Sequence, residues 1–100
     1  MKRKKSKPVP ALQAHACFPL RAVCGTWESL CGSPCIRIYH DGIRYRLQFI
    51  YKHDAVFTVP LRQSWGITFF YFYGMIRIAY DEERELLSLD IYGSYKRESL

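Results

Sequence analysis

The stretch IRYRLQFIYK, residues 43–52, decides the fold class. Its apolar and aromatic side chains fall on every second position, at Ile43, Tyr45, Leu47, Phe49 and Tyr51. The positions between them are polar or charged, apart from Ile50. A period of two is typical of a strand with one buried face. At about 3.3 Å per residue such a strand is long for a small domain, and we expect it to bend.

The segments on either side of this strand alternate in the same way. Upstream, CIRIYHDG (residues 35–42) ends in Asp41-Gly42, a strong hairpin signal, so the two strands are expected to pair antiparallel. Downstream, residues 55–62, 66–75, 75–83 and 85–98 continue the strand pattern between short turns. The stretch FFYFY at residues 69–73 places aromatic rings on both faces of its strand, so either the chain itself or a partner covers the second face.

The predicted fold is all-β. About seven strands form an antiparallel meander, and no segment after residue 25 has a convincing helical stripe. A meander leaves two exposed edges unless it closes, so we expect a small, partly or fully closed barrel. Any short helix is expected between residues 10 and 24.

The charge of the chain is concentrated at its N-terminus. Residues 1–24 contain six basic residues and no acidic ones, which accounts for the whole net charge of +6, whereas residues 25–100 contain nine of each. We therefore divide the chain into a basic arm, extended or partly helical, at residues 1–24 and a barrel domain at residues 25–100. The arm is either a solvated tail or a segment that attracts phosphate or acidic lipid.

The arm is not a convincing export signal. Its apolar run is interrupted by Gln13, His15, Pro19 and Arg21. No stretch approaches the roughly 20 apolar residues that a membrane-spanning helix needs. These patterns predict a cytoplasmic protein with no membrane span and with reduced cysteines.

The sequence offers little support for catalysis or metal binding. Cys17, Cys24, Cys31 and Cys35 lack the two tight pairs that structural zinc prefers. Only Cys31 and Cys35 approach such a pair, so incidental thiols are weighed above a zinc site. His40-Asp41 and His53-Asp54 lie at predicted turns, and nucleotide-binding and hydrolase motifs are absent. We therefore expect a non-enzymatic protein with no catalytic residues, no metal site and no cofactor.

Two resemblances to known families extend this interpretation. Gly25 and Trp27 match the Gly-x-Trp that opens the first strand of lipocalins, members of the calycin group, and the resemblance extends over residues 25–97. It implies a small lipocalin-like barrel in which the indole closes one end. About 75 barrel residues leave less room for a cavity than lipocalins have.

The narrower resemblance is to an uncharacterised family of small proteins from gut anaerobic bacteria, partly associated with conjugative transposons. Its motifs fall on Trp27, Ser29, Gly32, Pro34, Ile38 and Tyr39, then on Ile76, Ile78, Tyr80 and Asp81, and finally on Gly93, Tyr95 and Arg97. This resemblance implies no established activity.

The leading functional hypothesis is a binding module that recognises a small apolar ligand or a protein partner. The side chains expected to line the barrel interior are Trp27, Tyr45, Phe49, Phe57, Phe70 and Phe72.

Two alternatives remain open. The first is a nucleic-acid-binding accessory protein of a mobile element, because cations and rings together bind single strands; its candidate residues are Lys2, Arg3, Lys4, Lys5, Arg37, Arg44 and Arg46. The second is a structural homodimer formed through the aromatic strand.

Overall fold

The computed structural model describes residues 15–98 and contains nine β-strands in one sheet. A 3-10 helix, η2 (Leu20–Val23), precedes the strands and is the only helix within the described residues. The strands are β1 (Gly25–Ser29), β2 (Cys35–His40), β3 (Tyr45–Tyr51), β4 (Asp54–Pro60), β5 (Arg62–Ser64), β6 (Ile67–Tyr71), β7 (Met75–Asp81), β8 (Leu86–Leu89) and β9 (Gly93–Arg97).

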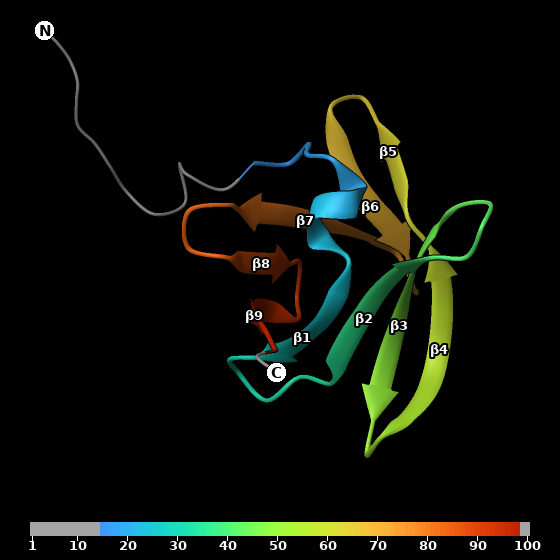
Figure 1. Cartoon of the computed structure of the whole chain (residues 1–100), viewed down its shortest axis with the longest axis vertical. Coiled ribbons are helices and arrows are strands. Elements are labelled where there is room, and N and C mark those ends of the chain that lie inside the picture. The colour runs from blue at the N-terminus through green and yellow to red at the C-terminus, as the bar shows by residue number, and fades with distance from the viewer. Residues whose placement is uncertain (1–14, 99–100) are drawn as a thin grey trace, which may run out of the picture.

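The sheet is an antiparallel meander that nearly closes into a barrel (Figure 1). The strand order is β4-β3-β2-β1-β9-β8-β7-β6-β5, so the first strand pairs with the last. The break in the ladder lies between β4 and β5, which follow each other in the chain. The predicted all-β meander with partial or complete closure is confirmed, whereas the predicted count of seven strands is wrong.

The extra strands arise where the chain changes direction or partner without a conventional turn signal. The stretch at residues 85–98 contains both β8 and β9, because residues 90–92 form a turn in which Ile91 has a φ of 61°. The stretch at residues 55–62 runs through β4 into β5. Leu61 still donates its N–H to the Tyr45 carbonyl at 2.9 Å, but Arg62 already pairs with Phe69 of β6.

β4 and β5 are therefore two halves of one bent strand that changes partner at Leu61. β4 pairs with β3 and β5 pairs with β6. Strands that bend and switch partners make the corners of small β-barrels. Pro60 suits this corner because it has no N–H to donate and a proline is tolerated only where a sheet ends or bends. The bent strand spans the gap that would otherwise leave the barrel open.

The strand that decided the fold class is shorter than predicted. Leu47 and Phe49 are buried as expected, but Ile43 lies outside β3 with 81% of its surface exposed, and Tyr51 is also exposed. Asp41 causes the shortening, because its carboxylate accepts the N–H groups of Ile43 and Arg44 at 2.8 Å and holds residues 41–44 as a loop. The predicted antiparallel pairing of β2 with β3 is confirmed.

A β-bulge in β4 interrupts its pairing with β3. The register shifts between Phe49, which faces Phe57, and Ile50, which faces Ala55, so Val56 has no partner of its own. A bulge bends its strand and strengthens the local twist. The bulge lies at the end of the barrel that carries the candidate site.

The core fills the middle of the barrel. The largest fully buried side chains are Trp27, Tyr95, Phe70, Ile36, Ile38, Leu47, Ile78, Leu87, Val23 and Thr68. Phe18 and Val23, from the segment before β1, belong to the same hydrophobic cluster. Part of residues 15–24 therefore packs onto the barrel.

Candidate functional site

The two ends of the barrel differ in how they are covered. Successive turns of an antiparallel meander lie at alternate ends. η2 covers the end at which β1 begins. The turns β1–β2, β3–β4, β6–β7 and β8–β9 lie at the opposite end, which we call the mouth.

Trp27 and Arg97 close the covered end. The Trp27 indole is fully buried and donates its N–H to the Val23 carbonyl of η2 at 2.9 Å. The Arg97 guanidinium lies 4.4 Å from the centre of the Trp27 ring and donates to the carbonyls of Ala22 at 2.8 Å and Cys24 at 2.6 Å. These bonds tie the last strand and the segment before β1 to the same indole.

Gly25 and Glu85 complete this arrangement. A Cβ on Gly25 would lie 2.9 Å from the Arg97 Nη1, so glycine leaves the space that the guanidinium occupies. Glu85 accepts from Arg97 at 2.9 Å and from the Tyr80 hydroxyl, and these two hydrogen bonds hold the pKa of Glu85 below its usual value. Gly25 and Trp27, which carried the sequence resemblance, thus serve to fasten the barrel.

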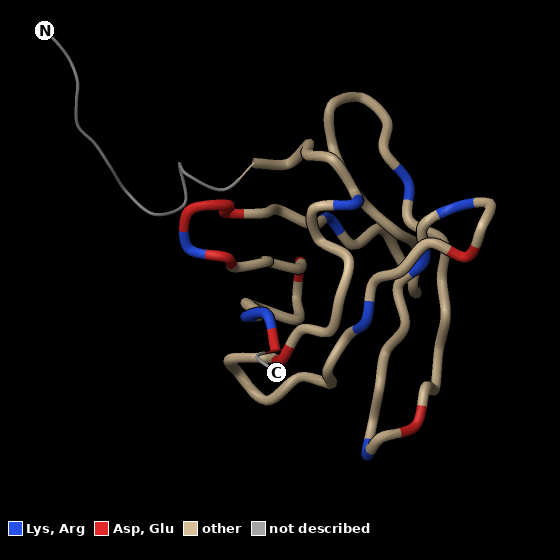
Figure 2. The backbone as a smooth tube through the Cα atoms, viewed as in Figure 1, with Lys and Arg blue, Asp and Glu red and all other residues tan. Residues whose placement is uncertain are grey.

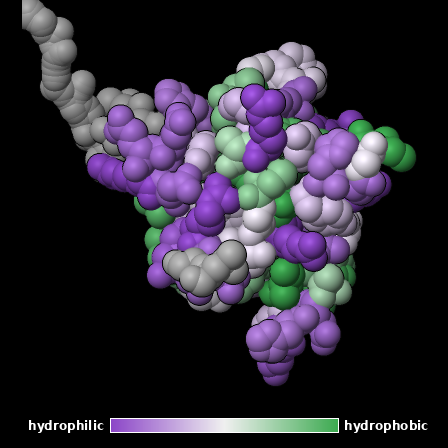
Figure 3. Space-filling model, viewed as in Figure 1, coloured by the Kyte–Doolittle hydropathy of each residue, from purple (hydrophilic) through white to green (hydrophobic). Residues whose placement is uncertain are grey.

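The mouth contains an apolar cleft of about 250 Å³. Its lining residues come from the turns and strand ends of this side of the barrel: Pro34, Phe49, Tyr51, Val56, Phe57, Phe72 and Tyr92. The rings pack edge to face or tilted, with centroid distances of 5.3 Å between Phe49 and Phe72 and 4.8 Å between Phe57 and Phe72. Figure 3 shows hydrophobic surface directly above the hydrophilic tip of the β3–β4 turn.

Of the six predicted interior residues, two lie in the core, three at the mouth and one near the other end. Phe49, Phe57 and Phe72 come together in the cleft, where Phe57 is 48% exposed. Trp27 and Phe70 are fully buried in the core. Tyr45 is half-buried and packs against His40 near the other end, with ring centroids 4.7 Å apart.

Hydrogen bonds between the β1–β2 loop and the β8–β9 turn position one wall of the cleft. The Tyr92 carbonyl accepts from the Ser33 hydroxyl at 2.7 Å and from the Cys31 thiol at 3.1 Å. The Tyr95 hydroxyl donates to the Pro34 carbonyl at 2.9 Å, and burial raises the pKa of Tyr95 to about 12, so this donor keeps its proton. Pro34 and Tyr92 are therefore held in fixed places.

Gly93 allows the Cys31 side chain to lie against the β8–β9 turn. Gly93 and Gly32 have similar left-handed φ angles, +90° and +86°, so alanine at either position should cost about 1 kcal/mol in backbone strain. A Cβ at Gly93 would in addition lie 2.3 Å from the Cys31 Sγ, whereas nothing lies within 4 Å of the same position at Gly32.

Gly93→Ala is therefore expected to lower the free energy of unfolding by about 2–3 kcal/mol, and Gly32→Ala by only about 1 kcal/mol. Urea unfolding of the two variants measures the difference. Adding Cys31→Ala to Gly93→Ala should recover most of the excess loss. Equal losses in the two single variants would contradict the predicted clash.

The basic residues proposed to bind nucleic acid differ in their partners and exposure. Arg46 is paired with Asp41, and the pKa of that carboxyl is held well below its usual range by the backbone N–H of Arg44, then by the Arg46 guanidinium and the N–H of Ile43. Arg37 lies over the Tyr39 ring at 5.4 Å, and Arg44 is exposed. Lys2, Arg3, Lys4 and Lys5 lie outside the described residues.

The described cysteines are all free thiols. Within residues 15–98, no group of three or more His, Cys, Asp or Glu side chains could hold a metal ion. No helix of these residues is long and apolar enough to cross a membrane.

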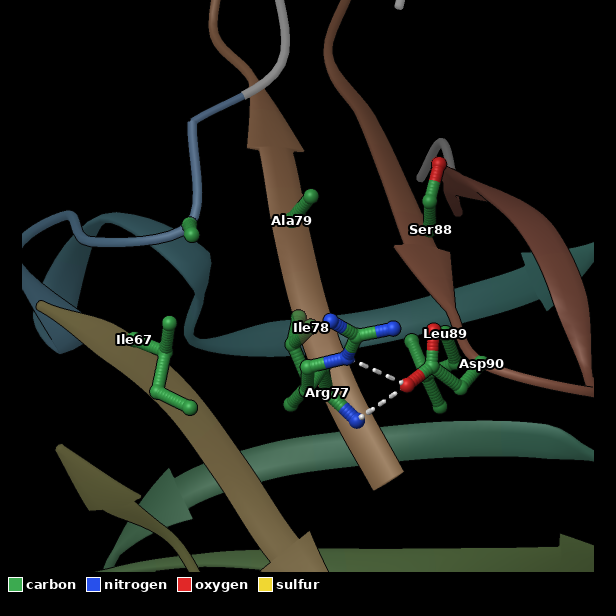
Figure 4. A pocket seen from close by; sticks show the side chains of 8 residues that line it. Ile67, Arg77, Ile78, Ala79, Ser88, Leu89 and Asp90 are labelled. Carbon is green, nitrogen blue, oxygen red and sulfur yellow. Dashed lines mark hydrogen bonds and ion pairs between the residues drawn. The ribbon is translucent and has the colours of Figure 1, made fainter. Parts of the chain in front are cut away.

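A second hollow lies on the outer face of the sheet (Figure 4). It has a volume of about 240 Å³ and lies over β6, β7 and β8, where Ala79 and Ser88 are small. Arg77 reaches across it to Asp90, with 2.8 Å between Nε and Oδ2. The sequence did not predict this groove. It did not single out the exposed Trp65 either, because Ser-Trp-Gly resembles neither a strand nor a common turn signal.

The comparisons with known proteins identify a family. Residues 12–97 match the model of a domain of unknown function, DUF3876, whose description reads "B. Theta Gene description". The chain belongs to this family. No curated protein and no solved structure matches the chain. In this DUF3876 domain, the matched range includes both the covered end and every residue of the mouth cleft.

Proposed function

We propose that the protein is a non-enzymatic binding module whose mouth cleft takes up a small apolar ligand. The observation that carries this proposal is the cleft itself, because its walls are almost entirely hydrocarbon and aromatic ring. Apolar area removed from water contributes about 25 cal/mol per Å², so a ligand with an aromatic or aliphatic body would gain most of its affinity here without polar contacts.

The size of the cleft restricts the ligand. Pockets for drug-sized molecules are typically about 300–1,000 Å³, and the mouth cleft, at about 250 Å³, is smaller. The core side chains occupy the middle of the barrel and leave the mouth as the place for a ligand. A molecule of one or two rings suits this volume better than a long acyl chain. We also propose that the barrel is lipocalin-like, with a covered end closed by Trp27 and Arg97 and a mouth that takes up the ligand.

The uncharged two-ring fluorophore Prodan (6-propionyl-2-dimethylaminonaphthalene) is a suitable probe, because its emission moves to shorter wavelength in apolar surroundings. We expect saturable binding to the full chain and roughly tenfold weaker binding to Phe57→Ser, which removes one wall of the cleft. The matched control is Tyr71→Ser. Tyr71 is about as exposed as Phe57 but lies outside the cleft, so this variant should bind like the wild type.

Equal affinity of the wild type and Phe57→Ser, or an equal loss in both variants, would refute the assignment to this cleft. Native mass spectrometry gives an independent readout. Extra mass of a small organic molecule on the purified protein supports the small-ligand proposal. A doubled mass instead indicates a second subunit, and loss of that dimer in Phe57→Ser would place the subunit at the mouth.

A further inference from the structure

An aromatic cluster lies on the outer face of the β5–β6 hairpin, away from the mouth cleft. Phe69 points outward and belongs to no part of the core cluster, yet only 2% of its surface is exposed. Trp65 stacks on it with ring centroids 6.2 Å apart and an interplanar angle of 13°, and Tyr71 packs edge-on at 5.5 Å. Trp65 itself is 84% exposed, so one face of the indole is covered while the rest of it meets solvent.

Two arginines flank this cluster. Phe69 pairs with Arg62 on β5 and with Arg77 on β7, so the two cations lie on either side of the ring on the same outer face. Arg77 is bound to Asp90, whereas none of the ion pairs within residues 15–98 involves Arg62. The cluster therefore combines a flat ring with an arginine that has no carboxylate partner among these residues.

The positive surface continues beyond the β5–β6 hairpin. Pro60, two residues before Arg62, pairs with Arg46, which pairs in turn with Tyr39 on β2. Arg37 and Arg44 are also exposed, whereas Arg46 is paired with Asp41. Figure 2 shows the acidic residues of the β7–β8 turn gathered at the left edge, while the basic positions of β2, β3 and β5 lie to the right.

The groove over β6–β8 extends this face. Arg77 of β7 lines the groove and pairs with Phe69, and Ile67 of β6 also lines it and pairs with Ser64, the residue before Trp65. In Figure 4 the Arg77 guanidinium lies across the groove with its Nε directed at Asp90. An extended ligand that crosses the indole can therefore continue into a concave, partly polar surface.

We propose that the outer face of β5–β7 binds single-stranded nucleic acid, with a base stacked on Trp65 and a backbone phosphate beside Arg62, while the Arg77–Asp90 pair borders the site. Exposed rings combined with cations bind single strands, because every base has a flat face and every nucleotide has a negative charge. A duplex keeps its bases stacked inside and cannot use the indole in this way. The proposed site shares no residue with the mouth cleft.

The two tryptophans allow a direct test, because Trp27 is fully buried and Trp65 is exposed. A titration of the full chain with a dT15 oligonucleotide at low salt should quench the red-shifted Trp65 emission and leave that of Trp27 unchanged. Trp65→Ala should bind roughly tenfold more weakly, as expected for the loss of one stacked base. Trp65→Phe should retain most of the affinity.

Tyr73→Ala is the matched control, because Tyr73 is 95% exposed but lies at the mouth. The affinity of this variant for dT15 should equal that of the wild type. Poly(vinyl sulfonate), a polyanion without bases, separates stacking from the attraction of the basic arm, and should bind without quenching Trp65. Unchanged dT15 affinity in Trp65→Ala would overturn the proposal. A second result would also overturn it: the wild type forms a dimer that Trp65→Ala abolishes, and dT15 does not quench Trp65. The partner of the indole would then be a second copy of the chain.

Discussion

Replacement of Trp27 by alanine is expected to lower the free energy of unfolding by about 3–5 kcal/mol, as is usual for a large buried ring. The indole is fully buried, donates its N–H to the Val23 carbonyl and supports both Tyr80 and Arg97. Its loss leaves a cavity and an unpaired carbonyl at the covered end. A domain of 100 residues has a free energy of unfolding of roughly 5–15 kcal/mol, so this loss removes a large fraction of it.

Urea unfolding followed by far-ultraviolet circular dichroism measures this loss. Trp65→Ala is the control, because it removes the same side chain from a position that is 84% exposed. We expect its cost to stay near 1 kcal/mol or below, mostly from the lost stack on Phe69. If Trp27→Ala is no less stable than Trp65→Ala, the assigned role of Trp27 at the covered end is wrong.

Arg97→Met is expected to lower the free energy of unfolding by about 2–3 kcal/mol. The guanidinium donates to the carbonyls of Ala22 and Cys24 and to the Glu85 carboxylate. Hydrogen bonds from a charged donor contribute about 1.5–3 kcal/mol each, but the side chain is 31% exposed, so only part of their sum remains. Methionine has an unbranched apolar side chain that can still cover the Trp27 ring, and it removes the charge and the three hydrogen bonds.

The matched control is Lys96→Met, since Lys96 is the neighbouring cation and is 56% exposed beside Glu28. An exposed ion pair is worth about 0–1 kcal/mol, so this variant should stay within that range of the wild type. Arg97→Lys should recover little, because one ammonium cannot reproduce the planar fork of donors. Recovery to wild-type stability in Arg97→Lys would show that charge alone matters at this position.

Arg97 also links stability to pH through Glu85. Hydrogen bonds from Tyr80 and Arg97 lower the folded-state pKa of Glu85, so Glu85 contributes stability that is present above its unfolded pKa and is lost as the pH falls through its folded pKa. The decrease in the free energy of unfolding between neutral and acidic pH should therefore be smaller in Arg97→Met than in the wild type. Urea unfolding at neutral and acidic pH compares the two proteins.

The covered end and the two proposed binding surfaces are separate parts of the molecule. Changes at Trp27 and Arg97 should act on stability, whereas changes at Phe57 should act on the uptake of an apolar probe and changes at Trp65 on nucleic-acid binding. Phe57 and Trp65 are exposed enough that their variants should remain folded. Stability and binding can therefore be measured on different variants.

Much of the fold was predictable from local patterns. Alternation along residues 43–52 predicted a β-strand, Asp41-Gly42 marked the turn between β2 and β3, and Gly25 and Trp27 indicated where the barrel begins. These predictions depend on which face a side chain takes within its own strand. The period of two determines that face, because neighbouring side chains point to opposite sides of a sheet.

The tertiary structure decided where along the barrel each side chain lies and which distant strands become neighbours. Phe57, Phe70 and Phe72 were all expected to line the barrel interior. The register places Phe57 and Phe72 at the mouth and Phe70 in the core. Likewise, the change of partner at Leu61 and the pairing of β1 with β9 depend on closure of the whole sheet. Closure is a property of all the strands together, so no single stretch of sequence contains it.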